Sequence, residues 1–271
     1  MTSLQRTARL ILFDLGAALP RLKGLFFLVP FALFWYVVLR IAGGSLAGWL
    51  QQPDGLRLAG LVFDRVQLDI LFVQNPPVLS IFLLVALITL PVFAILAGLD
   101  QFSSDLGRGY FRLLATRCRR GEIFVAAYAV ALLTLGGALT LALLAAVGVS
   151  LQRDAWPLPA TLLYAARIEV ILVVYAAALT GFMAVVSVLT RSAIAALFLA
   201  VCGYLFLLLL AAGLNHALPQ FAVFHYLLPG ALKGSLPFLA PSALALALAT
   251  LALYAAVYTG LAWWLFRSAR L

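Results

Sequence analysis

The chain has 271 residues, of which 66% are hydrophobic and only 10% are charged, and its formal net charge is +9. Soluble domains have about 25% charged and 45 to 50% apolar residues, so the composition excludes a soluble protein and predicts an integral membrane protein. The basic balance does not indicate nucleic-acid binding, because no polar stretch is long enough to form a solvated basic domain. The isolated Cys118 and Cys202 predict neither a disulfide framework nor a cysteine metal site.

Residues 1–23 are expected to form a helix in the membrane interface rather than a cleavable signal peptide. The apolar run that follows them continues to about Ala42 without a small-residue cleavage site. Within the segment, apolar residues recur every three or four positions from Leu4 to Leu22, while Arg6 and Arg9 fall mostly on other faces. This pattern is typical of an interfacial amphipathic helix, and residues 24–271 then form the transmembrane domain.

Six mainly apolar stretches are long enough to cross a bilayer, which needs about 20 residues each. They are residues 24–42, 78–99, 123–149, 161–189, 193–213 and 243–266. The fourth and fifth are separated only by the polar turn at 190–193, and we split them because the combined run is too long for one crossing. The expected fold class is therefore an all-α integral membrane protein with six transmembrane helices.

Lysine and arginine collect in segments that share one side of the membrane if the N-terminus is inside. These segments are 1–23, 100–121, 190–192 and the tail after Phe266, and they hold twelve of the 18 basic residues. The outer loops are longer in total and hold only Arg57, Arg65, Arg153 and Lys233. Because basic residues favour the cytoplasmic side, we expect a multi-pass membrane protein with both termini in the cytoplasm.

Two outer loops are expected to contain short helices. Residues 43–77 include LRLAGLVFDRVQLDILF, which is too polar to span but rich in leucine, and this predicts a helix on the outer surface. Residues 214–242 include four prolines among apolar residues, which predicts two short broken or re-entrant helices before the sixth span.

Candidate catalytic and metal-binding groups are sparse. His216 and His225 lie nine residues apart without a nearby carboxylate, so packed or interfacial histidines are favoured over a zinc site. Arg167 and Glu169 lie in the first turns of a predicted span and, being two residues apart, do not face each other, so interfacial anchoring is favoured over substrate contact. No metalloprotease, serine-hydrolase or P-loop motif is present, and we expect no catalytic residue, metal or cofactor in this chain.

The most basic stretch is DLGRGYFRLLATRCRRGEIF, residues 105–124, with five arginines. We interpret residues 104–120 as one amphipathic cytoplasmic helix. Its predicted apolar face contains Leu106, Tyr110, Leu113 and Leu114, and its basic face contains Arg108 and Arg112. The arginines either meet anionic lipid headgroups, or they surround Tyr110 and Phe111 as anchors on a cytoplasmic partner.

The order of these parts resembles the ABC-2 permeases, the membrane subunits of ATP-binding-cassette exporters with the type V fold. Two runs carry the resemblance, DLGRGYFRLLATRCRRGEI before the third span and SVLTRSAIA between the fourth and fifth. The matching positions are Asp105, Gly109, Leu113, Leu114, Thr116, Arg117, Arg120 and Glu122. The chain departs from the family pattern at Cys118, where proline is frequent, and at Ala127, where lysine is frequent.

The resemblance implies a permease subunit that pairs with a second copy or paralogue, in membrane lipid, and with two cytoplasmic ATPase subunits that bind ATP and magnesium. It implies that residues 104–120 form the ATPase-coupling helix. The implied coupling residues are Asp105, Arg108, Tyr110, Phe111, Arg112, Arg117, Arg120 and Glu122. It also implies a substrate path along the second and fifth spans, where Thr89, Cys202 and Tyr204 lie among aliphatic residues that suit an apolar or amphipathic substrate.

Two other functions remain open at this stage. A membrane anchor or assembly subunit that does not transport would use the same basic helix to bind its partner. A membrane-embedded enzyme acting on lipids would need a cluster of polar groups, and the spans offer few.

Overall fold

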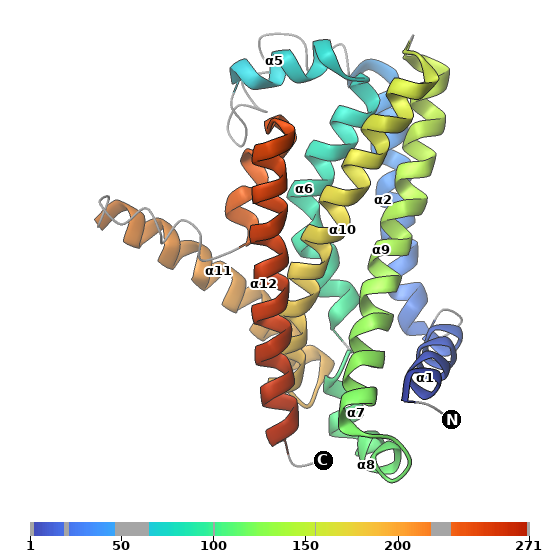
Figure 1. The fold of residues 1–271 in the computed structure, drawn as a ribbon, viewed down its shortest axis with the longest axis vertical. Coiled ribbons are helices and arrows are strands. Elements are labelled where there is room, and N and C mark those ends of the chain that lie inside the picture. The colour runs from blue at the N-terminus through green and yellow to red at the C-terminus, as the bar shows by residue number, and fades with distance from the viewer. Residues whose placement is uncertain are drawn as a thin grey trace.

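The computed structural model describes residues 3–18, 22–46, 65–99, 101–154, 156–217 and 229–269, and in these residues it contains helices and no strand (Figure 1). Among the described residues, six helices are long and apolar enough to cross a membrane. They are α2 (Leu22–Ile41), α6 (Pro77–Gly98), α9 (Arg120–Arg153), α10 (Leu158–Leu189), α11 (Ala193–Ala217) and α12 (Pro241–Ser268). Their ends agree with the six predicted spans to within about one helical turn, so the prediction of an all-α chain with six such helices is confirmed.

Proline and polar residues mark the ends of these helices. Pro77 and Pro241 are the first residues of α6 and α12, where the missing N–H removes no intrahelical hydrogen bond. α10 ends at Leu189 and α11 begins at Ala193, so the turn at residues 190–192 lies where it was predicted. α2 continues beyond Ile41 into a π-helical turn, η1 (Ala42–Leu46).

The helix α6 lies at the centre of the bundle. Within its most apolar stretch 78% of the residues are buried, compared with 11% for α11 and for α12. The rings of Trp35 on α2 and Phe82 on α6 are 4.4 Å apart, and a Cβ atom at Gly98 would lie 2.7 Å from the Cβ of Met183 on α10. Figure 1 shows α11 leaning away from the other helices, which leaves much of its apolar surface uncovered.

The two ends of the bundle carry different short elements. At the α5 end, α5 (Arg65–Gln74) lies across the helix ends, and its Leu68 and Leu71 belong to a core cluster against which Phe238 packs. At the α7–α8 end lie α1 (Ser3–Ala18), α7 (Ser103–Gly107) and α8 (Tyr110–Ala115). The start of α1 and the end of α12 share this second end, as an even number of spans requires (Figure 1).

The structure refines the predicted loops. Within residues 43–77, where a helix on the outer surface was predicted, the structure has the helix α5, and residues 47–64 lie outside the described part. For the predicted broken helices at 214–242, α11 extends to Ala217, and two 3-10 turns, η3 (Pro229–Gly234) and η4 (Leu236–Phe238), precede α12. His225 and the side chain of His216 lie outside the described residues.

The expectation of one helix over residues 104–120 is wrong. α7 ends at Gly107 and α8 begins at Tyr110, and Gly109 between them has a left-handed backbone with φ of 70°. A left-handed residue ends a helix, and glycine adopts this conformation without a steric penalty from Cβ. The buried face of the segment also differs from the predicted apolar face, because Leu113 is 70% exposed and Phe111 is only 3% exposed.

Candidate functional site

Residues 102–115, which we call the α7–α8 unit, are attached to α10 through Ser187. The backbone N–H groups of Phe102 and Ser103 donate hydrogen bonds to Ser187 Oγ, with distances of 2.8 and 3.0 Å. The first N–H groups of a helix have no partner within the helix and need an outside acceptor. Ser187 is fully buried, so a side chain in a span caps the start of α7.

The unit also lies against the turn between α10 and α11. Gly107 is so close to the backbone carbonyl of Arg191 that a Cβ atom at this position would overlap with the oxygen. A glycine is therefore required for the two backbones to approach each other here. Together with Ser187, this contact places α7 directly on the adjoining ends of two spans.

Substitution Gly107→Ala is expected to lower the free energy of unfolding by about 1–3 kcal/mol, because the added methyl group meets backbone rather than a movable side chain. The matched control is Gly137→Ala in α9, where the new Cβ would have no atom within 4 Å. The control should be neutral or more stable by up to about 1 kcal/mol, because alanine is the better helix former. Thermal unfolding in detergent micelles compares the two, and equal stability of both variants would contradict the close approach.

A cluster of aromatic rings joins the α7–α8 unit to α9 and α12. The rings of Phe102 and Phe124 stack 5.2 Å apart, and Phe111 meets the ring of Phe266 edge-on at 5.6 Å. Phe111 is therefore an anchor within its own chain. Its expected contact with a partner is corrected, because a side chain inside this cluster offers no exposed surface.

Two further predicted coupling residues hold helix ends together. Glu122 is buried, and its Oε2 accepts a hydrogen bond of 3.0 Å from the backbone N–H of Arg119 at the start of α9. Arg120 Nη1 donates to the carbonyl oxygens of Arg267 and Ala269, at 2.7 and 3.3 Å. A cation at the C-terminus of a helix satisfies free carbonyl groups and the helix dipole, so Arg120 links the start of α9 to the end of α12.

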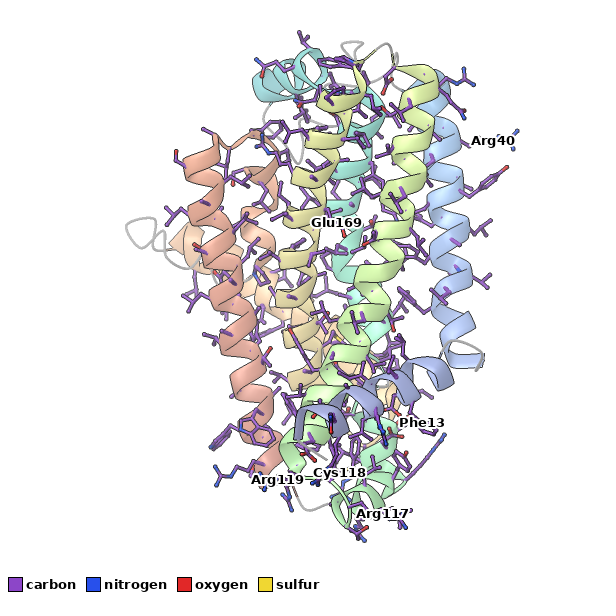
Figure 2. All side chains as sticks on the ribbon, turned by 45° about the vertical axis from the view of Figure 1, so that its right-hand side comes forward. Phe13, Arg40, Arg117, Cys118, Arg119 and Glu169 are labelled. Atoms are coloured by element: carbon purple, nitrogen blue, oxygen red, sulfur yellow. The ribbon has the colours of Figure 1, made fainter. Side chains whose placement is uncertain are left out.

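The outer surface of the unit is basic. The basic face consists of exposed arginines in the unit and next to it, namely Arg108 and Arg112 in the unit, Arg117 and Arg119 after α8, and Arg191 in the turn between α10 and α11. Within the described residues these guanidinium groups form no hydrogen bond or ion pair. Figure 2 shows Arg117 and Arg119 at this end of the bundle. Asp105 and Tyr110 are half-buried beside the face, so the remaining predicted coupling residues are near it but partly covered.

The residues of the predicted substrate path do not form a polar site in the described part of the chain. Thr89 donates its hydroxyl hydrogen bond to the carbonyl of Val85 in its own helix, at 2.8 Å, and Cys202 is exposed on α11. The ring of Tyr204 lies 6.2 Å from that of Phe182 on α10. Tyr204 therefore packs against its own bundle, and no hydrogen bond joins the three residues.

A partly buried contact between α9 and α10 was not predicted from the sequence. Glu169 lies about 16 Å along α10 from its start, and its Oε1 is 2.6 Å from Thr140 Oγ1, while Oε2 is buried without a partner in the described residues. Arg167 instead donates from Nη2 to the carbonyl oxygen of Leu239, at 2.6 Å. The expected interfacial anchoring is corrected for Glu169, which Figure 2 places inside the bundle. The available signal was an ionisable residue within a span, which is frequently functional.

Comparison with known proteins does not assign the chain to a family. No protein-family model and no curated protein sequence matches it.

Proposed function

We propose that the chain is the permease subunit of an ATP-binding-cassette exporter of the ABC-2 type, in which the α7–α8 unit couples a cytoplasmic ATPase to the spans. One observation carries this proposal. The unit is attached to α9, α10 and α12 by buried contacts, while its arginines remain exposed. Because packed contacts do not deform freely, a partner that displaces the unit moves the attached helices with it. A helix that only meets lipid headgroups needs no such attachments.

In this proposal the α7–α8 end faces the cytoplasm of a bacterial-type inner membrane. The basic face and the exposed Arg267 lie at this end, whereas Arg40 and Arg153 are the exposed described arginines near the other. The positive-inside tendency then places both termini in the cytoplasm. α1 becomes an interfacial helix whose exposed Leu12 and Phe13 enter the lipid, and α5 becomes an interfacial helix on the outer side (Figure 2).

The proposed assembly contains a second copy or a paralogue of this chain and two ATPase subunits, which bind ATP and magnesium. The uncovered apolar face of α11, with the exposed Phe206 and Leu209, offers surface for the second permease. The spans carry few polar side chains, which suits export of an apolar or amphipathic substrate.

Charge reversal on the basic face tests this function. The double variant Arg108→Glu, Arg112→Glu should reduce ATP hydrolysis that co-purifies with the tagged chain by tenfold or more. The attraction between these arginines and opposite charges on the partner would be replaced by repulsion, at a cost of about 1.4 kcal/mol or more. The measurement is magnesium-dependent ATP hydrolysis per permease, after mild detergent extraction from the native membrane. The matched control is Arg108→Lys, Arg112→Lys, which changes the same two exposed side chains but keeps their positive charge and should retain the activity.

Two outcomes would contradict the proposal in different ways. Unchanged co-purification of ATPase activity with the variant Arg108→Glu, Arg112→Glu would show that the basic face does not dock the ATPase. An ATPase that co-purifies with the chain but drives no ATP-dependent transport in reconstituted vesicles would indicate the alternative, a membrane anchor or assembly subunit.

A further inference from the structure

A groove opens between α2 and α9 near the α5 end of the bundle. It has a volume of about 590 Å³, and its walls are mainly apolar, with Phe31, Trp35 and Leu39 on α2 and Ala142, Ala145 and Val149 on α9. This volume lies within the range of about 300–1,000 Å³ for ligand pockets. The small side chains of α9 make the space, because two alanines face aromatic residues across the gap.

Two arginines lie at one end of this apolar groove. Arg40 and Arg153 both line it, and neither forms an ion pair in the described residues. Arg40 Nη1 only donates to Tyr36 Oη of its own helix, at 3.3 Å. The lining residues include no carboxylate. The neighbouring carboxylate of Asp154 is already an acceptor, from the Val78 N–H at 3.3 Å and the Ser150 hydroxyl at 2.7 Å.

We propose that this groove binds a phospholipid with an anionic headgroup, with one acyl chain between α2 and α9 and the phosphate on Arg40 and Arg153. The apolar walls match the chain, and the two uncompensated guanidinium groups match the headgroup. Arginine binds phosphate through paired, charge-assisted hydrogen bonds. A net negative headgroup is preferred over a zwitterionic one, because a zwitterionic lipid brings its own cation next to two arginines. The site lies at the opposite end from the basic face and does not depend on the exporter proposal.

Lipid-dependent stability of the purified full chain tests the proposal. In a neutral detergent, dioleoyl phosphatidylglycerol should raise the unfolding temperature by roughly 5 °C more than dioleoyl phosphatidylcholine at the same mole fraction, because a ligand that binds only the folded state stabilises it. The preference should disappear in Arg40→Gln, Arg153→Gln. It should persist in the matched control Arg108→Gln, Arg112→Gln, which removes two arginines at the other end.

Three further measurements show which part of the molecule and of the lipid causes the stabilisation. Ala145→Phe fills the groove from an exposed position and should abolish the stabilisation by phosphatidylglycerol. Inorganic phosphate should give no shift. In the wild-type chain, phosphatidylglycerol with brominated acyl chains should quench tryptophan fluorescence more than brominated phosphatidylcholine. The variant Trp35→Phe should remove this difference, because Trp35 lines the groove.

Several results would overturn the site. One is a preference for phosphatidylglycerol that persists in the Arg40, Arg153 double variant, and another is an equal shift with inorganic phosphate. A dimer that dissociates on Ala145→Phe, in a chain with no lipid preference, would assign the groove to a second copy instead. If the arginine variant does not fold, equal quenching by the two brominated lipids in the wild type would reject the proposal by itself.

Discussion

Replacement of Phe266 by alanine is expected to lower the free energy of unfolding by about 3–5 kcal/mol. Phe266 is fully buried at the end of α12, and its ring centre lies 5.5, 5.6 and 5.7 Å from those of Phe102, Phe111 and Phe124. Truncation removes the apolar area of the ring and leaves a cavity between α8, α9 and α12. The surrounding rings are held by separate helices and can fill this space only in part, so the cost lies in the range for large-to-small core substitutions.

The control for this prediction is Trp264→Ala on the same helix turn. Trp264 is 64% exposed, so its truncation removes a larger ring without opening an internal cavity and should cost much less. Unfolding in lipid–detergent micelles measures both variants. Because the cluster also holds the α7–α8 unit, amide hydrogen exchange of residues 103–115 should accelerate in Phe266→Ala and remain unchanged in Trp264→Ala. Equal costs for the two variants would show that the cluster does not hold the unit.

The six spans were predictable because each depends on local information. A run of apolar residues of sufficient length determines a span, and the charged turn at Arg191 separates α10 from α11 regardless of distant contacts. The helix α5 was predictable for the same reason, since its composition is too polar to cross a membrane and too apolar for a solvated loop.

The detailed form of the α7–α8 unit was not predictable from local pattern. Gly107 and Gly109 flank Arg108, and glycine is compatible with both a weak helix and a break, so the choice depends on contacts elsewhere. The structure resolves it through Ser187 and the backbone of Arg191, which are both distant in sequence. Phe111 turns inward for the same reason, because its partner Phe266 belongs to the last span.

The contact of Glu169 was also beyond sequence periodicity. Helical spacing shows which residues share a face of α10, but it does not identify the helix that packs on that face. Thr140 lies on α9, and only the packing of the two helices brings its hydroxyl to the carboxyl group.

Substitution Thr140→Val is expected to lower the free energy of unfolding by about 3 kcal/mol. Valine keeps the shape of threonine but removes the hydroxyl, which is 2.6 Å from Glu169 Oε1. Since Oε2 has no partner among the described residues, neither oxygen of this carboxyl group would then have a donor there. A buried polar group without a partner costs about 1–3 kcal/mol, and the upper end of the range applies because both carboxyl oxygens would lack a donor among the described residues.

Thr134→Val in the same helix is the matched control. The hydroxyl of Thr134 donates only to the carbonyl of Val130, at 2.8 Å, and this carbonyl belongs to its own helix. Loss of this bond should cost less than about 1 kcal/mol, because the carbonyl keeps its helical hydrogen bond. The difference between the two threonine variants therefore isolates the contact with Glu169 from the general effect of exchanging threonine for valine in α9.

A double-mutant cycle completes the test. Glu169→Met replaces the carboxyl group by an apolar side chain of similar length, so the double variant Thr140→Val, Glu169→Met should be more stable than Thr140→Val alone. Replacing both partners by apolar groups removes the unpaired acceptor as well as the bond, and this exchange is close to neutral. The free energy of unfolding of the four proteins gives the coupling between the two positions. Additive changes in the free energy of unfolding would mean that Thr140 and Glu169 do not interact, and this result would contradict their contact between α9 and α10.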